Sequence, residues 1–426
     1  MPGPRCRHPL VLAPVRAAAL FLTLGGVALL GCRDDAESPT GPAPAPALAT
    51  TLTAALAFNQ VSAGEEYTCG VTTGNRAYCW GASAEGQLGN GDRTGPETCL
   101  NAGPCSTRPL AVVGGLSFRQ ISAGFFTTCG VTTDNRAYCW GHNELGEVGD
   151  GTTAFRLTPV PVAGGHKFRQ VETTFEHTCG VSYPDNLAYC WGRNTDGQLG
   201  VGTRTGPQTG LFGAYSATPV AVARALPFRQ VSTGYYHTCG VTTDDRAFCW
   251  GLNKLGQVGD SSTVYRRLTP SRVGRSRQWH LVDAGAEHTC AVTTGNRAFC
   301  WGDGRAGQVG NGKSYLSFWP KAVSGGLSFT RVTAALEYTC GETTLNRAYC
   351  WGSSFLGQPG GATTSLTPVA VAGGLLFSQV SAGDAHTCGR TPEGVAHCWG
   401  RNFHGELGNG TFSIAEPTPV TVVGPS

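Results

Sequence analysis

The sequence predicts an all-β protein, a seven-bladed β-propeller with four short antiparallel strands in each blade. Three observations support this fold class. A unit of about 50 residues occurs seven times, each unit contains four short strand-like segments, and each has a cysteine pair flanking a tight turn. A period near 50 is typical of a propeller or a solenoid. The 62 glycines and the single methionine favour short strands joined by turns over a helical bundle.

The repeats occupy residues 58–426. Their first residues are Phe58, Phe118, Phe168, Phe228, Trp279, Phe329 and Phe377. In the second unit the four expected strands are FRQISA, TTCGVT, AYCWG and TPVPV. Because only the turn TDNR separates the second segment from the third, these two are expected to form a hairpin.

The cysteines follow the same register, with one pair in each unit. The pairs are Cys69 with Cys79, Cys129 with Cys139, Cys179 with Cys190, Cys239 with Cys249, Cys290 with Cys300, Cys340 with Cys350, and Cys388 with Cys398. Residues placed symmetrically about a hairpin turn face each other at nearly the distance that a disulfide spans. We therefore expect seven cross-strand disulfides; a metal site, free thiols and pairing between blades are the alternatives. Cys99 and Cys105 are expected to pair within a surface loop, and so many disulfides would require an oxidising compartment.

The first 57 residues do not belong to the repeats. Three arginines precede an apolar stretch over residues 17–30, which ends in Leu29-Leu30-Gly31-Cys32. This pattern resembles a bacterial lipobox and predicts a lipoprotein signal peptide over residues 1–31, with Cys32 lipidated. An ordinary signal peptide is the alternative. Residues 32–57 are rich in Pro and Ala and are expected to form an extended tether. The expected location is outside the cytoplasm, on the membrane of a bacterial cell envelope or on the cell surface.

Two further features are common to the units. A tryptophan follows the second cysteine and is expected to pack between blades; these residues are Trp80, Trp140, Trp191, Trp250, Trp301, Trp351 and Trp399. A G-x-x-G element comes next, and its glycines are expected to adopt positive φ in a turn.

Three runs of the fourth unit identify the repeat: residues 234–242 (GYYHTCGVT), 246–251 (RAFCWG) and 253–260 (NKLGQVGD). They resemble the repeat of the regulator of chromosome condensation family, and the resemblance implies a seven-bladed propeller. Nuclear members of that family are nucleotide-exchange factors for a small GTPase. An export signal and a nearly balanced charge argue against transferring that role here. The chain departs from the pattern at Glu172, at Pro359 and in the seventh unit, which lacks the Asn-Arg-Ala element.

No catalytic constellation is visible. His177, His237, His288 and His386 occupy one register, and a ring of histidines around a channel could ligate a metal. Tyr67, Thr127 and Tyr338 replace them in the other units, which favours a structural, hydrogen-bonded role. The sequence has no H-E-x-x-H, G-x-S-x-G or phosphate-binding loop motif. We therefore expect no enzyme activity, no catalytic or metal-binding residue and no cofactor.

The residue pair before the His/Tyr-Thr-Cys run varies most between units. Aromatic side chains occupy it in units two to four and form the candidate binding face: Phe125, Phe126, Phe175, Tyr235 and Tyr236. Packing at a blade junction is the alternative. The variable loops carry further aromatic residues, including Phe155, Phe212 and Trp319. The fourth unit adds a basic strip that could meet an acidic partner or an anionic glycan, with a solvated face as the alternative: Arg266, Arg267, Arg272, Arg275 and Arg277.

These features favour a lipid-anchored propeller that acts as a protein-binding scaffold or inhibitor. The resemblance supports an inhibitor role, because secreted members of the family include inhibitors of β-lactamases. A carbohydrate-binding module is the alternative, and an envelope hydrolase or lyase is less favoured. The expected partner is a protein, with a glycan second and the membrane reached through the lipid. The formal charge of +3 gives no support for nucleic-acid binding, and a monomer is expected.

Overall fold

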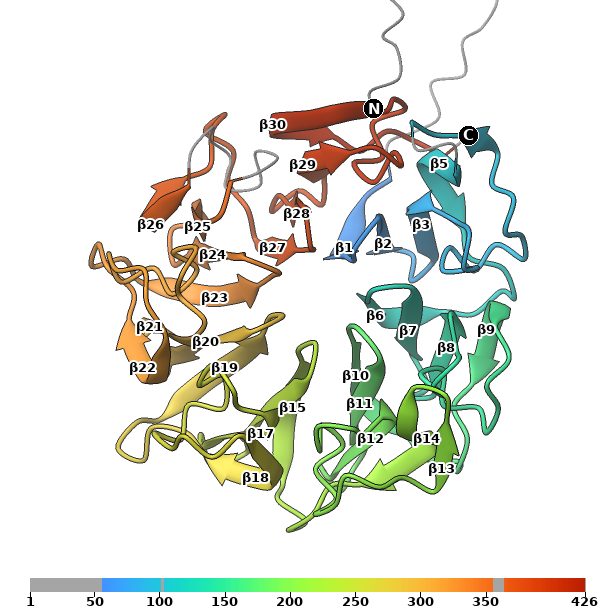
Figure 1. Cartoon of the computed structure of the whole chain (residues 1–426). Helices are drawn as coiled ribbons and strands as arrows, with labels where there is room; N and C mark the ends of the chain where they lie inside the picture. Colours follow the sequence, from blue (N-terminus) through green and yellow to red (C-terminus); the bar gives the residue numbers. More distant parts are fainter. Residues whose placement is uncertain (1–55, 101–102, 355–363, 426) are drawn as a thin grey trace, which may run out of the picture. The chain divides into compact units, whose positions relative to one another are not determined.

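The computed structural model describes residues 56–100, 103–354 and 364–425. The predicted signal peptide, the lipidation site Cys32, nearly all of the tether and Pro359 lie outside these residues. The described part is a ring of seven antiparallel sheets, each built from one repeat, as Figure 1 shows. The predicted fold class is therefore confirmed. None of the described residues forms a helix that is long and apolar enough to cross a membrane.

The first four blades follow the chain. Blade 1 contains β1 (Phe58–Ala63), β2 (Tyr67–Thr72), β3 (Ala77–Ala82), β4 (Glu97–Thr98) and β5 (Pro104–Ala111). Blade 2 contains β6 (Phe118–Ala123), β7 (Thr127–Thr132), β8 (Ala137–Gly141) and β9 (Arg156–Pro161). Blade 3 contains β10 (Phe168–Thr173), β11 (His177–Ser182), β12 (Ala188–Arg193), β13 (Gln208–Gly210) and β14 (Gly213–Ala221). Blade 4 contains β15 (Phe228–Thr233), β16 (His237–Thr242), β17 (Ala247–Leu252) and β18 (Arg266–Arg272).

The remaining blades have four strands each. Blade 5 contains β19 (Trp279–Ala284), β20 (His288–Thr293), β21 (Ala298–Gly302) and β22 (Ser317–Ala322). Blade 6 contains β23 (Phe329–Ala334), β24 (Tyr338–Thr343), β25 (Ala348–Gly352) and β26 (Ser365–Ala370). Blade 7 contains β27 (Gln379–Ala382), β28 (His386–Arg390), β29 (Ala396–Asn402) and β30 (Ser413–Thr421).

Blades 1 and 3 depart from the expected four strands. Their variable stretches are about ten residues longer than those of the other units, and this length lets the chain fold back on itself. β4 pairs with β5, and β13 pairs with β14, so each of these blades gains a short outer strand. These strands are only two and three residues long and have no alternating pattern, which is why sequence reasoning missed them.

The hairpin register agrees with the sequence prediction. In every blade the two cysteines face each other across the second and third strands. All of these pairs form disulfides, with Cα–Cα distances of 4.0 to 4.1 Å. Cys69 is bonded to Cys79, Cys129 to Cys139, Cys179 to Cys190, Cys239 to Cys249, Cys290 to Cys300, Cys340 to Cys350, and Cys388 to Cys398.

The cysteine pair of the first variable loop is also bonded. Cys99 forms a disulfide with Cys105, and its Cα–Cα distance of 6.0 Å is longer than that of the hairpin pairs. The alternatives of metal ligation, free thiols and pairing between blades therefore do not describe these sixteen cysteines. So many disulfides indicate an oxidising, extracytoplasmic location.

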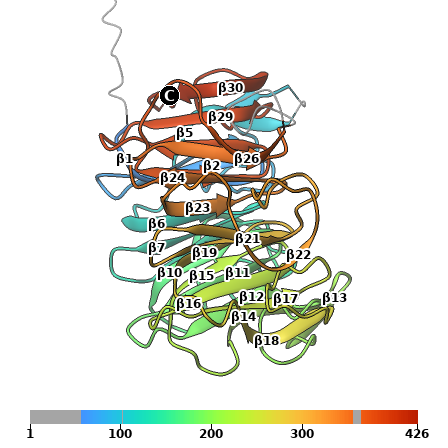
Figure 2. The same ribbon diagram turned by 90° about the vertical axis from the view of Figure 1, so that its left-hand side faces the viewer.

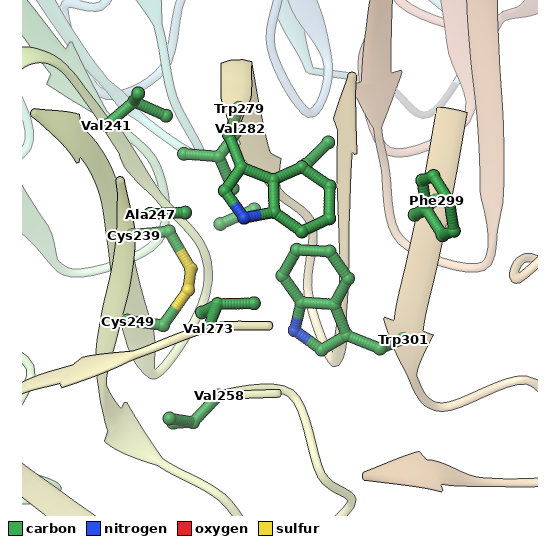
Figure 3. Packing of buried hydrophobic residues seen from close by; sticks show 12 residues of the cluster. Cys239, Val241, Ala247, Cys249, Val258, Val273, Trp279, Val282, Phe299 and Trp301 are labelled. Carbon is green, nitrogen blue, oxygen red and sulfur yellow. A yellow bond between two sulfur atoms is a disulfide. The ribbon is translucent and has the colours of Figure 1, made fainter. Parts of the chain in front are cut away.

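The hydrophobic core lies between neighbouring blades. Figure 3 shows Trp279 and Trp301 of blade 5 packed against the disulfide and the valines of blade 4. Trp301 Nε1 donates to the Gln257 carbonyl oxygen, 2.9 Å away in the G-x-x-G loop of blade 4. A Cβ atom at Gly259 would clash with this indole nitrogen, and Gly259 has a φ of +70°. Both predictions, tryptophan between blades and positive-φ glycine in the loop, are confirmed.

The inner strands are joined by side chains. Gln60 of β1 donates its amide to the Ile121 carbonyl oxygen (2.7 Å) and accepts from the Ile121 amide (2.9 Å). The same paired bonds are made by Gln120, Gln170, Gln230 and Gln379. Gln379 binds Val61, so blade 7 closes onto blade 1. Each sheet comes from one unit, and closure involves no exchange of terminal strands among the described residues.

Candidate binding face at one end of the channel

The two ends of the ring carry different loops. Each inner strand runs toward the loop that joins it to the second strand, such as residues 64–66 in blade 1. We call this the loop end. The turns between the second and third strands, such as residues 73–76, lie at the opposite, hairpin end. Figure 2 shows the ring from its side, with the strands running between the two ends.

The five predicted aromatic residues gather at the loop end. Phe125 lies with its ring centroid 4.4 Å from that of Phe126 and 4.8 Å from that of Phe175. The Phe175 ring stacks on Tyr235 at 4.8 Å and meets Tyr236 edge-on at 5.6 Å. Three consecutive blades thus contribute one continuous group of rings, which we call the aromatic face. All five side chains are half-buried.

One residue of the pair in blade 2 and one of the pair in blade 4 face the central channel. Phe125 and Tyr235 line the mouth of the central channel together with Glu65 and Asp384. The Tyr235 hydroxyl donates to a carboxylate oxygen of Asp384, which belongs to blade 7. The channel mouth is therefore bridged from one side of the ring to the other. Phe126 does not line the mouth but lines a second hollow, to which Phe125 also contributes, so the aromatic face has an inner and an outer part.

The carboxyl groups at the mouth are perturbed. Burial raises the pKa of Glu65 to about 9, and the nearby Asp384 adds to this shift. Burial also raises the pKa of Asp384 to about 6, against the opposing effect of the bond from Tyr235. Glu65 Oε2 has no hydrogen-bond partner in the described part of the chain. Glu65 is therefore protonated at neutral pH and adds no negative charge to the mouth.

The hollow on the outer part lies between blades 2 and 3. Its apolar lining consists of Phe125, Phe126, Leu145, Phe175 and Phe212, and its polar lining of His142, Glu144 and Glu176. Phe212 is 57% exposed, and the neighbouring Leu211 is fully exposed. An apolar hollow beside an exposed apolar loop is the arrangement expected of an interface anchor site.

Sequence reasoning found the aromatic pairs because the repeat register places them at equivalent positions. It did not find Leu145, because the position before the G-x-x-G element is not aromatic and its residue type varies between units. It did not find Leu211, because that residue lies in a loop of irregular length. The bridge from Tyr235 to Asp384 was also missed, since it joins two units that are not adjacent in the ring. Only closure of the ring brings these two side chains together.

The histidines are structural. His177 Nε2 lies 2.8 Å from Thr238 Oγ1, and the Thr238 hydroxyl donates to the Gln198 carbonyl oxygen. The threonine hydrogen is thus already used, so His177 must donate from Nε2. His237, His288 and His386 make the same contact with the next blade. Burial lowers the pKa of His177 to about 3, which keeps the ring neutral. No group of His, Cys, Asp and Glu that could hold a metal occurs among the described residues.

The basic strip of the fourth unit divides into two parts. Arg266 pairs with Asp196 (2.7 Å) and Arg267 pairs with Asp260 (2.5 Å), both at the loop end. Arg272, Arg275 and Arg277 lie at the hairpin end, where the chain passes from β18 to β19. The strip is therefore not one surface, although its residues follow one another closely in the sequence.

The fold and the aromatic face define a class of protein: a closed, disulfide-stabilised seven-bladed propeller with an apolar surface at one end. The RCC1-like domain profile matches residues 21–378, and the regulator of chromosome condensation (RCC1) repeat profile matches residues 377–406. The chain belongs to the RCC1-like domain family.

Parts of this chain are similar in sequence to known proteins. The Ultraviolet-B receptor UVR8 of Arabidopsis thaliana is 28% identical over 271 residues, which cover 63% of this chain and 58% of UVR8. The probable E3 ubiquitin-protein ligase HERC6 of Homo sapiens is 27% identical over 292 residues, covering 65% of this chain and 27% of HERC6. The chain thus spans less than two thirds of these relatives.

Solved structures share the fold. Human WBSCR16 has a TM-score of 0.70 at 18% identity, covering 82% of this chain and 94% of that one. Yeast RCC1 (Prp20) bound to Kap60 has a TM-score of 0.68 at 18% identity, covering 86% and 85%. At such identities the likeness shows the fold alone.

Proposed function

We propose that this protein is an exported, membrane-anchored propeller that binds another protein through the outer part of its aromatic face. The observation that carries the proposal is the hollow lined by Phe126, Phe175 and Phe212 beside the exposed Leu211. Aromatic side chains held rigidly by their neighbours make strong contacts at little entropic cost. The proposed role is binding, as a scaffold or an inhibitor, and involves no catalysis.

The electrostatics of the face suggest the kind of partner. Glu144 and Glu176 line the hollow; Glu144 lies 3.7 Å from the lining residue His142, and Glu176 is paired with Arg193. A partner segment that inserts an apolar side chain and carries a cation beside it would complement both the apolar lining and these two carboxylates.

The relatives support protein binding by analogy. Yeast RCC1 was crystallised bound to Kap60, and Prp20p of Saccharomyces cerevisiae was studied for its binding to Gsp1p and histones. Those partners belong to those proteins. What supports the proposal here is that a propeller of this family can present a protein-binding surface.

The anchor is proposed from the pattern Leu29-Leu30-Gly31-Cys32. Lipidation of Cys32 after removal of residues 1–31 would hold the propeller on a membrane through residues 32–57. The disulfides agree with export, because such bonds persist outside the cytoplasm.

The test is capture of a partner from envelope extracts with the chain from residue 32 onward and Cys32→Ser as bait. The variant carries Phe126→Ala, Phe212→Ala and Tyr236→Ala, which leaves the Tyr235–Asp384 bridge intact. The control carries Tyr315→Ala and Phe412→Ala, two exposed aromatic residues of other variable loops. We expect one protein to be captured by the parent and the control and reduced at least tenfold with the variant. Equal capture by all three would contradict the proposed face, and retention of glycans alone would favour a carbohydrate-binding module.

A further inference from the structure

The charges of the propeller are divided between its two ends. The cations at the hairpin end are Arg76, Arg119, Arg136, Lys167, Arg169, Arg224, Arg229, Arg246, Arg272, Arg275, Arg277, Arg297, Lys321, Arg331, Arg347 and Arg390. The acids at this end are Asp134, Asp185, Asp244, Asp245, Glu342 and Glu393. Cations outnumber acids there by more than two to one, whereas most of the other described acids lie at the loop end. The near-zero balance of the whole chain therefore hides a strongly basic surface.

Most acids of the hairpin end are already paired. Asp134 pairs with Arg136 (3.2 Å), Asp244 with Arg246 (2.6 Å) and Glu342 with Arg331 (3.4 Å). Asp245 pairs with Arg229. The acids are thus largely neutralised by neighbours, and the excess of positive charge stays with other residues.

The excess is densest at blades 4 and 5. Arg272, Arg275, Arg277, Arg297 and Lys321 line two adjoining shallow hollows that contain no acidic residue. We call these five residues the basic patch, and none of them makes an ion pair with a described residue. Arg277 lies over the Phe299 ring at 4.5 Å, and Lys321 lies over the Trp319 ring at 4.5 Å. Both residues are half-buried, and a cation held over a ring face can still offer its N–H groups to a ligand.

Apolar side chains protrude at or near the same end. Tyr183 and Leu345 occupy hairpin turns, where they are 52% and 74% exposed. Trp319 of β22, beside the basic patch, is 50% exposed. Protruding aromatic and aliphatic side chains among cations are typical of surfaces that settle at the lipid–water interface.

The chain also enters the propeller at this end. β1 begins at Phe58 and runs toward the loop end, so residue 57, which directly precedes β1, lies at the hairpin end. A lipid on Cys32 would therefore be joined to the propeller at its basic end, through residues 33–57.

We propose that the hairpin end docks on an anionic phospholipid surface, with the basic patch as its main contact. This inference rests on the proposed anchor for its orientation. Charge spread over a whole end of the ring, together with protruding apolar tips, fits an extended surface better than a single polymer chain in a groove. A lone lipid chain gives only marginal membrane binding, so a second, electrostatic contact would make attachment stable and turn the aromatic face outward.

The experiment uses the chain from residue 32 onward with Cys32→Ser, so that no lipid contributes. Binding is measured by flotation with two kinds of vesicle, at low and at high salt. One kind is phosphatidylcholine alone, and the other contains about 30% phosphatidylglycerol. The variant carries Arg272→Gln, Arg275→Gln and Lys321→Gln. The matched control carries Arg204→Gln, Lys254→Gln and Lys313→Gln, which remove the same charge from the loop end.

Each engaged cation contributes about fivefold to partitioning, so the variant should bind anionic vesicles about 100-fold more weakly. The control should bind like the parent, and salt should weaken both. Equal losses in variant and control, binding that does not require the anionic lipid, or binding to heparin without binding to vesicles would each overturn the proposal. Partner capture through the aromatic face is measured separately, so the result for one proposal can be interpreted even when the other proposal fails.

Discussion

Replacement of Glu172 by serine should stabilise the propeller, and more strongly at high pH. In four other blades a serine at this position accepts a hydrogen bond from the next inner strand, as Ser62 does from the Ala123 amide at 2.9 Å. Asp283 and Thr333 accept the same bond in blades 5 and 6. Glu172 makes no such bond to Thr233 in the described part of the chain. Its carboxylate instead lies in the channel, where burial and the nearby Asp283 raise its pKa to about 8.

The pH dependence follows from this shift. The folded protein keeps a proton on Glu172 that the unfolded protein has released at its ordinary pKa of 4.5. Stability is therefore lost as the pH rises from 4.5 toward 8, by at most about 1.4 kcal/mol per pH unit. Because the channel admits water, we expect about 2 kcal/mol in total for this term. The new hydrogen bond adds about 1 kcal/mol at any pH.

Urea unfolding with the disulfides intact measures the difference. Glu172→Ser should raise the free energy of unfolding by about 1 kcal/mol at pH 5 and by about 3 kcal/mol at pH 9. Glu172→Gln, which removes the charge and keeps the size, should show only the pH-dependent part. A serine variant that is less stable than the parent, or a gain that is the same at both pH values, would refute the reasoning.

The other predictions concern the contacts between blades, a hairpin disulfide and the anchor. Gln120→Leu should lower the free energy of unfolding by about 2 kcal/mol in urea titration, because the Val171 amide and carbonyl lose their partner; Leu281→Gln is the reverse control at the same register. Trp301→Ala should cost about 3–5 kcal/mol, since a fully buried indole and its bond to Gln257 are lost; unfolding at an unchanged urea concentration would count against packing between blades. Joint replacement of Cys239 and Cys249 by alanine should lower the free energy of unfolding by about 2–3 kcal/mol, because one loop closure is removed. This difference between parent and variant should vanish when both proteins are fully reduced before unfolding. Cys32→Ala should move the protein from membrane to soluble fractions, and unchanged retention would argue against the lipid anchor.

The repeat made most of the fold predictable. Seven copies of one pattern give the same local information seven times, so the hairpin register, the cysteine pairs and the tryptophan positions could be read from single units. The short strands β4 and β13 could not, because they depend on where a long loop happens to fold back. Tertiary contact alone decides their pairing.

The candidate site was predictable only in part. Phe125, Phe175 and Tyr235 could be placed on one face by symmetry. Which of them line the channel mouth and which line the outer hollow depends on side-chain directions. The Tyr235–Asp384 bridge spans the ring, and no pattern within a unit reports it. The division of charge between the two ends could not be predicted for a similar reason. Arg266 and Arg272 are close in sequence, but they are the first and last residues of β18 and therefore lie at opposite ends of the ring.

The most direct test of the central claim is photo-crosslinking in cells with a photoreactive phenylalanine analogue. The analogue is placed singly at Phe126, at Phe212 or at the hairpin-end residue Leu345. A partner bound at the outer aromatic face predicts one protein adduct of the same mass at Phe126 and Phe212 and no such adduct at Leu345. Adducts of that protein at Leu345 alone, or no protein adduct at either phenylalanine, would contradict the account.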